Sequence, residues 1–146
     1  MSELSVNELI ENFELLDQWE DRYRYIIDLG RALPAMAEAD KTEANRVHGC
    51  VSQVWLRSDM SDETPPRIHF AADSDAFIVK GLVAILMMVY QDRTADEILA
   101  ADIRGILDRL GLAQALSPSR SNGLYAMVKR IRALAGHHAA GASLPA

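Results

Sequence analysis

The sequence contains a single cysteine, Cys50, and the residues around it favour a reactive thiol. The cysteine lies in the segment Val-His-Gly-Cys-Val-Ser-Gln-Val-Trp at residues 47–55, directly behind Gly49 and ahead of a β-favouring run. Glycine permits a backbone turn that other residues resist, so this position indicates a junction between a loop and a strand. Arg46 and His48 are close enough in sequence to lower the thiol pKa, because a neighbouring cation stabilises the thiolate. The alternative is a small buried hydrophobe, the usual role of a lone cysteine.

Arg120 is the second candidate site residue. It falls in or just before the first turn of the expected last helix, where the helix dipole disfavours a cation. A residue placed against local preference suggests a non-local task, such as binding a carboxylate or an anionic sulfur. The alternative is a solvated arginine beside serine and asparagine caps.

Other kinds of site leave no signature in the sequence. The histidines have no zinc-ligand spacing with Cys50, and the glycines form no phosphate-binding loop. A cysteine–histidine hydrolase would need a base and an oxyanion donor, and no motif marks either. We therefore expect neither a metal nor a cofactor. The histidines concerned are His48, His69, His137 and His138.

Composition limits the class of protein. The 146 residues, 49% hydrophobic and 25% charged, predict one domain with a core of its own. A net charge of −6 argues against a nucleic-acid binder. The longest apolar run, residues 81–89, is too short to span a bilayer, and the acidic start has no signal core. One cysteine cannot form an internal disulfide, which fits the reducing cytoplasm that we expect.

Two amphipathic helices are expected first. Residues 5–8 match a capping box, and apolar residues at helical spacing follow to about residue 16. Asp17 is the expected cap of a second helix, which Pro34 ends. The short joint between them predicts an αα-hairpin packed on the rest of the chain.

The middle of the chain predicts a small antiparallel sheet. Residues 51–56 and residues 67–71 have the composition or alternation of strands, and a turn region at residues 59–66 separates them. Residues 46–48 are a candidate short first strand, preceded by a polar loop at residues 35–46. The expected arrangement is a meander of two or three strands.

Helices are expected after the sheet. Residues 76–90 are apolar nearly all round, as in a buried central helix whose only internal charge, Lys80, reaches solvent by its stem. Asp73 and Asp75 are expected to cap this helix. Further expected elements are helices from residue 94 to 101 and from 103 to 110, a last helix ending near Gly136, and a disordered tail at residues 137–146. The core domain would then span residues 1–136.

Several short motifs occur along the chain in the same order as in the SufE-type sulfur acceptors of iron–sulfur cluster assembly, including the CsdE paralogue, and the sequence resembles that family. The combination of Gly-Cys-x-Ser-x-Val-Trp with Ser-Pro-Ser-Arg is highly specific, and the match runs over roughly residues 11–135. The matching segments are Trp19-Glu20 with Tyr23, residues 25–30, Leu33-Pro34, residues 47–55, residues 73–75, residues 78–82 and residues 116–124.

The resemblance implies an α+β fold, IscU/SufE-like, with a small antiparallel sheet of about three strands packed against several helices. It implies that Cys50 accepts persulfide sulfur from a PLP-dependent cysteine desulfurase of the SufS or CsdA type. The protein would stimulate that enzyme and deliver the sulfur to an iron–sulfur scaffold of the SufBCD type. Arg120 matches an arginine that the family uses near the site, and His48 stays a candidate for tuning the thiol. The chain would be a sulfurtransferase-like accessory protein and not a stand-alone enzyme.

Several alternatives stay open at this point. The protein could instead be an interaction module that activates a desulfurase allosterically, with Cys50 structural, or a cysteine-dependent hydrolase. The motifs do not separate the SufE and CsdE subtypes, and both a monomer and a homodimer are compatible with them. Asp73 and Asp75 could belong to a docking face. Gly49 beside an apolar run suggests that Cys50 is sheltered when idle and swings out on docking.

Overall fold

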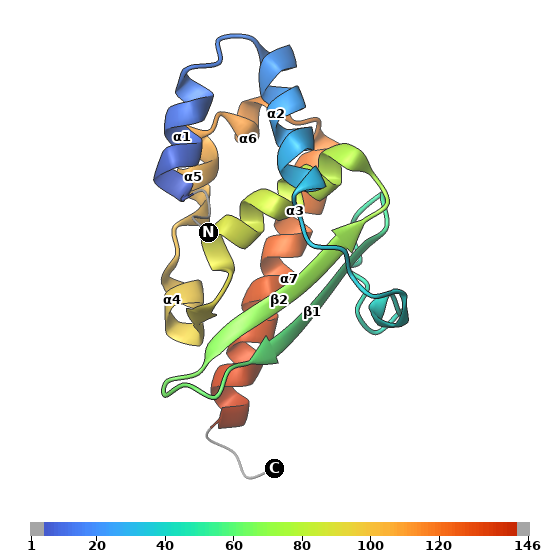
Figure 1. Ribbon diagram of the computed structural model, residues 1–146, viewed down its shortest axis with the longest axis vertical. Coiled ribbons are helices and arrows are strands. Elements are labelled where there is room, and N and C mark those ends of the chain that lie inside the picture. Colours follow the sequence, from blue (N-terminus) through green and yellow to red (C-terminus); the bar gives the residue numbers. More distant parts are fainter. Residues whose placement is uncertain (1–4, 143–146) are drawn as a thin grey trace.

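A three-stranded antiparallel sheet and seven α-helices make up the α+β fold of the computed structural model, which describes residues 5–142 (Figure 1). This confirms the expected fold class. The helices are α1 (Val6–Glu14), α2 (Trp19–Arg31), α3 (Phe77–Tyr90), α4 (Ala95–Ala100), α5 (Ile103–Arg109), α6 (Leu112–Ala115) and α7 (Pro118–Ala142), with a 3-10 turn at Glu38–Asp40. The strands are β1 (Val54–Met60), β2 (Arg67–Ser74) and β3 (Arg93–Thr94), in the order β1-β2-β3.

The sheet differs from the expected meander in where its first strand begins and ends and in which segment forms the third strand. β1 begins at Val54, later than predicted, and continues to Met60 through part of the expected turn, because each of its residues has a partner on β2. The candidate strand at residues 46–48 is only one isolated bridge, between Arg46 and Trp55. The third strand is instead β3, which pairs with the start of β2.

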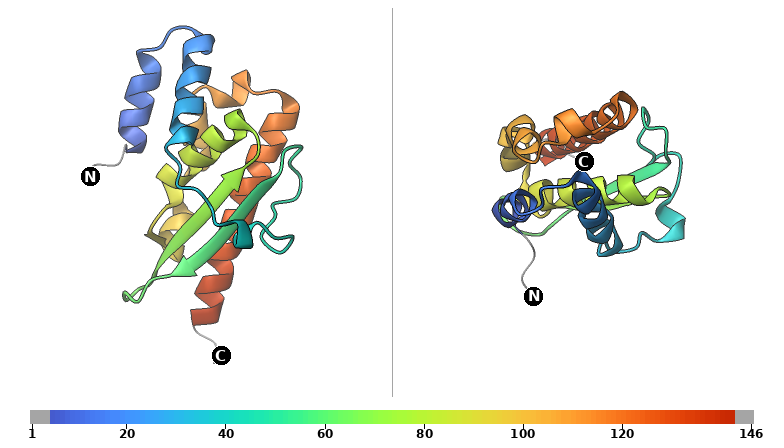
Figure 2. Two further views of the ribbon diagram at one scale, coloured as in Figure 1. Left: turned by 45° about the vertical axis from the view of Figure 1, so that its right-hand side comes forward. Right: turned by 90° about the horizontal axis from the view of Figure 1, so that it is seen from above.

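Two helices cross at glycines. A Cβ at Gly30 of α2 would lie 2.7 Å from the backbone nitrogen of Gly81 on α3, and a Cβ at Gly81 would overlap the carbonyl of Ile26. The absence of side chains therefore lets the two backbones touch. α3 is buried along most of its length, as its composition predicts. The expected hairpin of α1 and α2 stands at one end of the molecule, while α7 runs along the β1–β2 hairpin (Figures 1 and 2).

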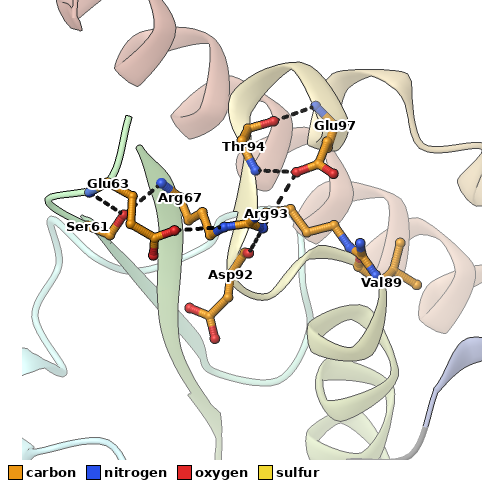
Figure 3. A network of polar contacts seen from close by, with 8 residues as sticks. All are labelled: Ser61, Glu63, Arg67, Val89, Asp92, Arg93, Thr94 and Glu97. Carbon is orange, nitrogen blue, oxygen red and sulfur yellow. Dashed lines mark hydrogen bonds and ion pairs between the residues drawn. The ribbon is translucent and has the colours of Figure 1, made fainter. Parts of the chain in front are cut away.

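A polar network holds β3 against β2 (Figure 3). The Arg67 guanidinium lies 3.1 Å from Glu63 and 3.8 Å from Glu97, and it donates to the carbonyl of Asp92 at 3.0 Å. Thr94 and Glu97 form the predicted capping box of α4. The capping box of α1 at Ser5 is likewise confirmed.

The predicted cap of α5 at Asp102 is confirmed, but those of α2 and α3 were wrong. The N-cap of α2 is Gln18 and not Asp17, and it has no side-chain capping bond. Asp73 and Asp75 do not cap α3, whose N-cap is Ala76, because both carboxylates have other partners described below. Side-chain direction depends on tertiary neighbours, which local sequence does not define.

The last helix is longer than predicted. It continues past Gly136 to Ala142, so residues 137–142 are helical and not a disordered tail. His138 from this extension lies against β1, with its Nε2 atom 2.8 Å from the hydroxyl of Ser58. The prediction for residues 143–146 lies outside the described residues. No helix among residues 5–142 has both the length and the apolar character needed to cross a bilayer.

Candidate functional site

Cys50 lies in a loop at residues 47–53, ahead of β1 and not in a helix or strand. Gly49 has a φ of +92°, a left-handed conformation that glycine adopts without strain. A Cβ there would also approach the Cβ of Ala126 on α7 to 3.2 Å. The positive φ and the nearby helix therefore both favour glycine before the cysteine.

Hydrogen bonds close the base of this loop. On one side, the amide of Val47 donates to the carbonyl of Val54 at 2.8 Å. On the other, the amide of Gln53 donates to Asp75 Oδ1 at 3.0 Å, and the amide of Asp75 donates to the carbonyl of Gln53 at 3.2 Å. The loop is thus anchored to the sheet and to the β2–α3 junction, with residues 48–52 between the anchors.

Cys50 lines a cavity of about 360 Å³ between its own loop, α3 and the first turns of α7. One part of the wall is apolar and comes from the two helices: Ile78, Val79, Leu82, Leu124 and Met127. The other part is polar and includes Ser52, Ser117, Ser119 and Arg120. The cavity that contains the thiol is therefore lined both by apolar side chains and by a cationic residue.

The environment of the thiol opposes its ionisation. Burial raises the pKa of Cys50, and the charge of Arg46 lowers it only in part. Sγ also lies 3.4 Å from the carbonyl of Gly123 on α7, an acceptor suited to the protonated thiol. Arg46 lowers the pKa of the thiol, as predicted, but the net shift of that pKa is upward. The thiol is therefore protonated at neutral pH in this structure.

The structure places Arg120 at this cavity. The residue lies in the first turn of α7, and its amide donates to the hydroxyl of Ser117 at 3.3 Å. Its side chain is exposed and belongs to no ion pair within residues 5–142. Arg120 and Cys50, far apart in the sequence, thus line one cavity.

His48 has a different neighbour. Its Nε2 atom lies 3.3 Å from Glu43 Oε1, and its side chain is largely exposed. It makes no contribution to the shifted pKa of Cys50. In this conformation the structure does not bring His48 to the thiol.

A buried carboxylate beneath the loop was missed by sequence reasoning. Asp73 is only 5% exposed; its Oδ1 atom accepts from the amide of Ser74 at 2.8 Å, and its two oxygens lie 3.3 Å from Lys80 Nζ and 3.5 Å from Lys41 Nζ. Burial opposes ionisation of Asp73, but the Ser74 amide and the two lysines hold its pKa below its usual range. Lys80 therefore pairs with a buried carboxylate instead of extending freely into water. The run Asp-Ser-Asp before a helix looks like a set of caps, so no local signal reveals this pair.

Two large apolar side chains are exposed here: Val51, which lines the cavity, and Phe77, which is adjacent in sequence to two lining residues. Val51 follows Cys50 and is 87% exposed, and Phe77 lies between Ala76 and Ile78 and is 76% exposed. In the described part of the chain, no group of three histidine, cysteine or acidic side chains is arranged to hold a metal ion.

Comparisons with known proteins agree on one family. A family model described as "SufE: Fe-S metabolism associated domain" matches residues 7–135. An uncharacterized SufE-like protein of Rhizobium etli is 52% identical over 129 residues, which cover 88% of this chain and 87% of that protein. An uncharacterized SufE-like protein of Rhizobium meliloti is 45% identical over 129 residues, which cover 88% of this chain and 92% of that protein.

A solved structure has the same fold. The solution structure of a hypothetical protein from Thermus thermophilus superposes with a TM-score of 0.73, covering 94% of this chain and 97% of that one, at 20% identity. The family match, over residues 7–135, includes the whole Cys50 loop, β1, β2 and most of α7. The chain therefore belongs to the SufE family, whose domain is associated with iron–sulfur metabolism.

Proposed function

We propose that this protein accepts sulfur on Cys50 from a PLP-dependent cysteine desulfurase of the SufS or CsdA type, stimulates that enzyme and passes the sulfur to a scaffold of the SufBCD type. The observation that carries the proposal is the position of the chain's one thiol: on a loop behind a left-handed glycine, in a cavity that it shares with Arg120. Membership of the SufE family supplies the link to iron–sulfur metabolism.

The transfer follows thiol–disulfide exchange. The Cys50 thiolate attacks the terminal sulfur of the donor's cysteine persulfide, a new sulfur–sulfur bond forms, and the bond to the donor cysteine breaks. The donor cysteine leaves as a thiolate, so the step needs no external oxidant or reductant. The proton of the Cys50 thiol must leave first, and the raised pKa makes this unfavourable in the resting conformation.

The resting loop is therefore a sheltered state. We propose that docking moves the loop about Gly49, breaks the contact between Sγ and the Gly123 carbonyl, and exposes the thiol to water and to the donor. In that position desolvation no longer raises the pKa. A role for His48 in tuning the thiol would also need this movement, because its imidazole lies beside Glu43 at rest.

Arg120 is proposed to stabilise the anionic sulfur at the mouth of the cavity. A guanidinium stays charged at any physiological pH, and no acidic side chain of residues 5–142 neutralises this one. Replacement by alanine, Arg120→Ala, is expected to slow sulfur transfer roughly tenfold, as loss of a charge-assisted contact. Arg120→Lys, which keeps a cation, is expected to retain part of the rate. Equal rates for the wild-type protein and Arg120→Ala would remove Arg120 from the mechanism.

The decisive experiment is intact-protein mass spectrometry after incubation with a cysteine desulfurase and free cysteine. We expect one added sulfur atom, located on Cys50 by peptide mapping and removed by a thiol reductant. The variant Cys50→Ser is the matched control and should take up none. The exchange needs a free thiol, which a reducing cytoplasm preserves, and we propose that compartment.

The burial of Cys50 also supports a second candidate function, an interaction module that activates the desulfurase allosterically. The sulfur-acceptor role and the interaction module predict different results in the mass-spectrometry experiment. No sulfur adduct, together with a Cys50→Ser variant that still stimulates the desulfurase, would favour the module and contradict the sulfur-acceptor role.

A further inference from the structure

A second groove, of about 430 Å³, lies between the start of α5 and the middle of α7. It is formed by apolar residues such as Val128 together with Tyr125 and four charged side chains. The charged residues are Asp102, Arg104, Lys129 and Arg132. None of them lines the Cys50 cavity.

The groove is basic although the chain carries a net charge of −6. None of Arg104, Lys129 and Arg132 forms an ion pair with another side chain of residues 5–142. The one carboxylate, Asp102, caps α5, because its Oδ1 accepts from the amide of Gly105 at 3.1 Å. It forms no ion pair with the three cations, so its charge reduces the positive charge of the groove without cancelling it. The three cations are thus left without an anionic partner within this part of the chain.

Two of the cations are held in place by other contacts. The guanidinium of Arg104 lies 5.8 Å from the ring centroid of Tyr125, across the groove from α5 to α7. Arg132 donates from Nη1 to the carbonyl of Leu99 at 2.9 Å. Neither contact neutralises the charge, so the groove presents oriented positive groups beside an aromatic face.

The groove and the Cys50 cavity use different sides of α7. Gly123, Leu124 and Met127 face the cavity, whereas Tyr125, Lys129 and Arg132 face the groove. At about 100° of rotation per residue, the two sets are centred well over a quarter of a turn apart on the helix. A ligand in the groove would therefore leave the cysteine loop accessible.

We propose that this groove binds an acidic segment of a partner protein, with carboxylates on Arg104, Lys129 and Arg132 and an apolar side chain on Tyr125 and Val128. Charge complementarity supports this occupant, since unpaired cations in a groove of this kind attract and orient a segment of opposite charge. A nucleic acid is disfavoured because its phosphates continue beyond the groove onto a chain whose net charge is −6, whereas a short acidic segment can keep its carboxylates within the groove. The inference is independent of the sulfur-acceptor role, and the groove could be occupied while Cys50 reacts.

The test is an NMR titration of the full ¹⁵N-labelled chain with a synthetic peptide of alternating glutamate and leucine residues. We expect saturable shifts of the amides at residues 101–104 and 125–132, and none at residues 49–52. The same peptide with glutamine in place of glutamate should not bind. A shift confined to the cysteine loop, or equal binding of the glutamine peptide, would overturn the proposal.

Charge-reversal variants make the test specific. Arg104→Glu combined with Lys129→Glu is expected to weaken peptide binding by roughly tenfold, while Arg24→Glu combined with Arg31→Glu, which changes net charge equally on exposed parts of α2, stays within about twofold. Equal losses in both variants would show an effect of net charge and not of the groove. Circular dichroism and thermal unfolding check that both variants fold.

Two further measurements can contradict the proposal. A single-stranded oligothymidylate that binds the groove more tightly than the peptide would identify a nucleic-acid site instead. Alkylation of Cys50 should proceed at the same rate with and without saturating peptide. Slower alkylation would contradict the separation of the two sites on α7.

Discussion

At the scale of single residues, the behaviour of Cys50 depends on what surrounds it more than on its neighbours in sequence. The charge of Arg46 lowers the pKa of the thiol, but burial against α7 raises it by a larger amount, so the net shift is upward. The side chain is also oriented by the carbonyl of Gly123 at 3.4 Å. Its reactivity should therefore respond to changes that open the loop.

The first prediction concerns the pH dependence of alkylation. Because the pKa of Cys50 is raised, the rate of reaction with iodoacetamide should reach its half-maximum at a higher pH in the folded protein than in urea, where an ordinary thiol has a pKa of about 8.5. Arg46→Ala should move the folded profile still higher, because it removes a lowering charge. A folded profile that coincides with the unfolded one would contradict the sheltered thiol.

The second prediction concerns the anchor of the loop. Asp75→Ala removes the acceptor of the Gln53 amide, so the loop should open more often and Cys50 alkylation should accelerate roughly fivefold, as expected for a hydrogen bond of about 1 kcal/mol. Asp75→Asn keeps a side-chain oxygen and is the matched control, with a rate near that of the wild-type protein. Equal acceleration in both variants would indicate that the charge, and not the hydrogen bond, holds the loop.

At the scale of elements, the crossing of α2 and α3 positions one wall of the cysteine cavity. α3 contributes Ile78, Val79 and Leu82 to that wall, and its approach to α2 is set by Gly30 and Gly81. The site therefore depends on a helix contact that lies away from the thiol.

The third prediction tests this contact. Gly81→Ala should lower the free energy of unfolding by about 1–3 kcal/mol, because the new methyl group meets the backbone of Ile26 and the helices must separate. Gly136→Ala is the control: nothing lies within 4 Å of its added Cβ, and alanine in a helix interior should stabilise α7 by up to about 1 kcal/mol. Urea unfolding of both variants provides the measurement, and a Gly81→Ala variant as stable as wild type would refute the tight crossing.

At the scale of the whole molecule, Asp73 joins three separate parts of the chain. Its carboxylate, at the end of β2, meets Lys80 of α3 and Lys41 of the loop before β1. The Lys41 ammonium also lies 5.5 Å from the ring of Trp55. These contacts connect the sheet, the central helix and the loop that leads to the cysteine.

The fourth prediction follows from the lowered pKa of Asp73. A carboxyl group whose pKa is lower in the folded state stabilises the protein above its unfolded pKa, and this stabilisation is lost as the pH falls through the folded value. Asp73→Asn should therefore cost roughly 2 kcal/mol at neutral pH, and the difference from wild type should shrink below about pH 4. Urea unfolding across pH measures it. Asp62→Asn, at an exposed position, should show neither effect.

Local patterns in the sequence determined the features that depend on near neighbours. The capping boxes at Ser5 and Thr94 were predicted because each is made by residues three positions apart. The buried α3 and the glycine turn before Cys50 were likewise predicted from local composition and adjacent residues. The α+β fold was expected from the strand and helix patterns together with the resemblance to the SufE family. The resemblance to the SufE family, which the comparisons confirm, also rests on short motifs in order.

The tertiary structure alone decided the features that depend on distant partners. Strand ends follow the pairing of β1 with β2, so β1 starts at Val54 and not at Val51. Asp73 could be assigned a role only once Lys41 and Lys80 were seen beside it. The protonation of Cys50 is the clearest case, because burial against a helix far along the chain outweighs the adjacent arginine.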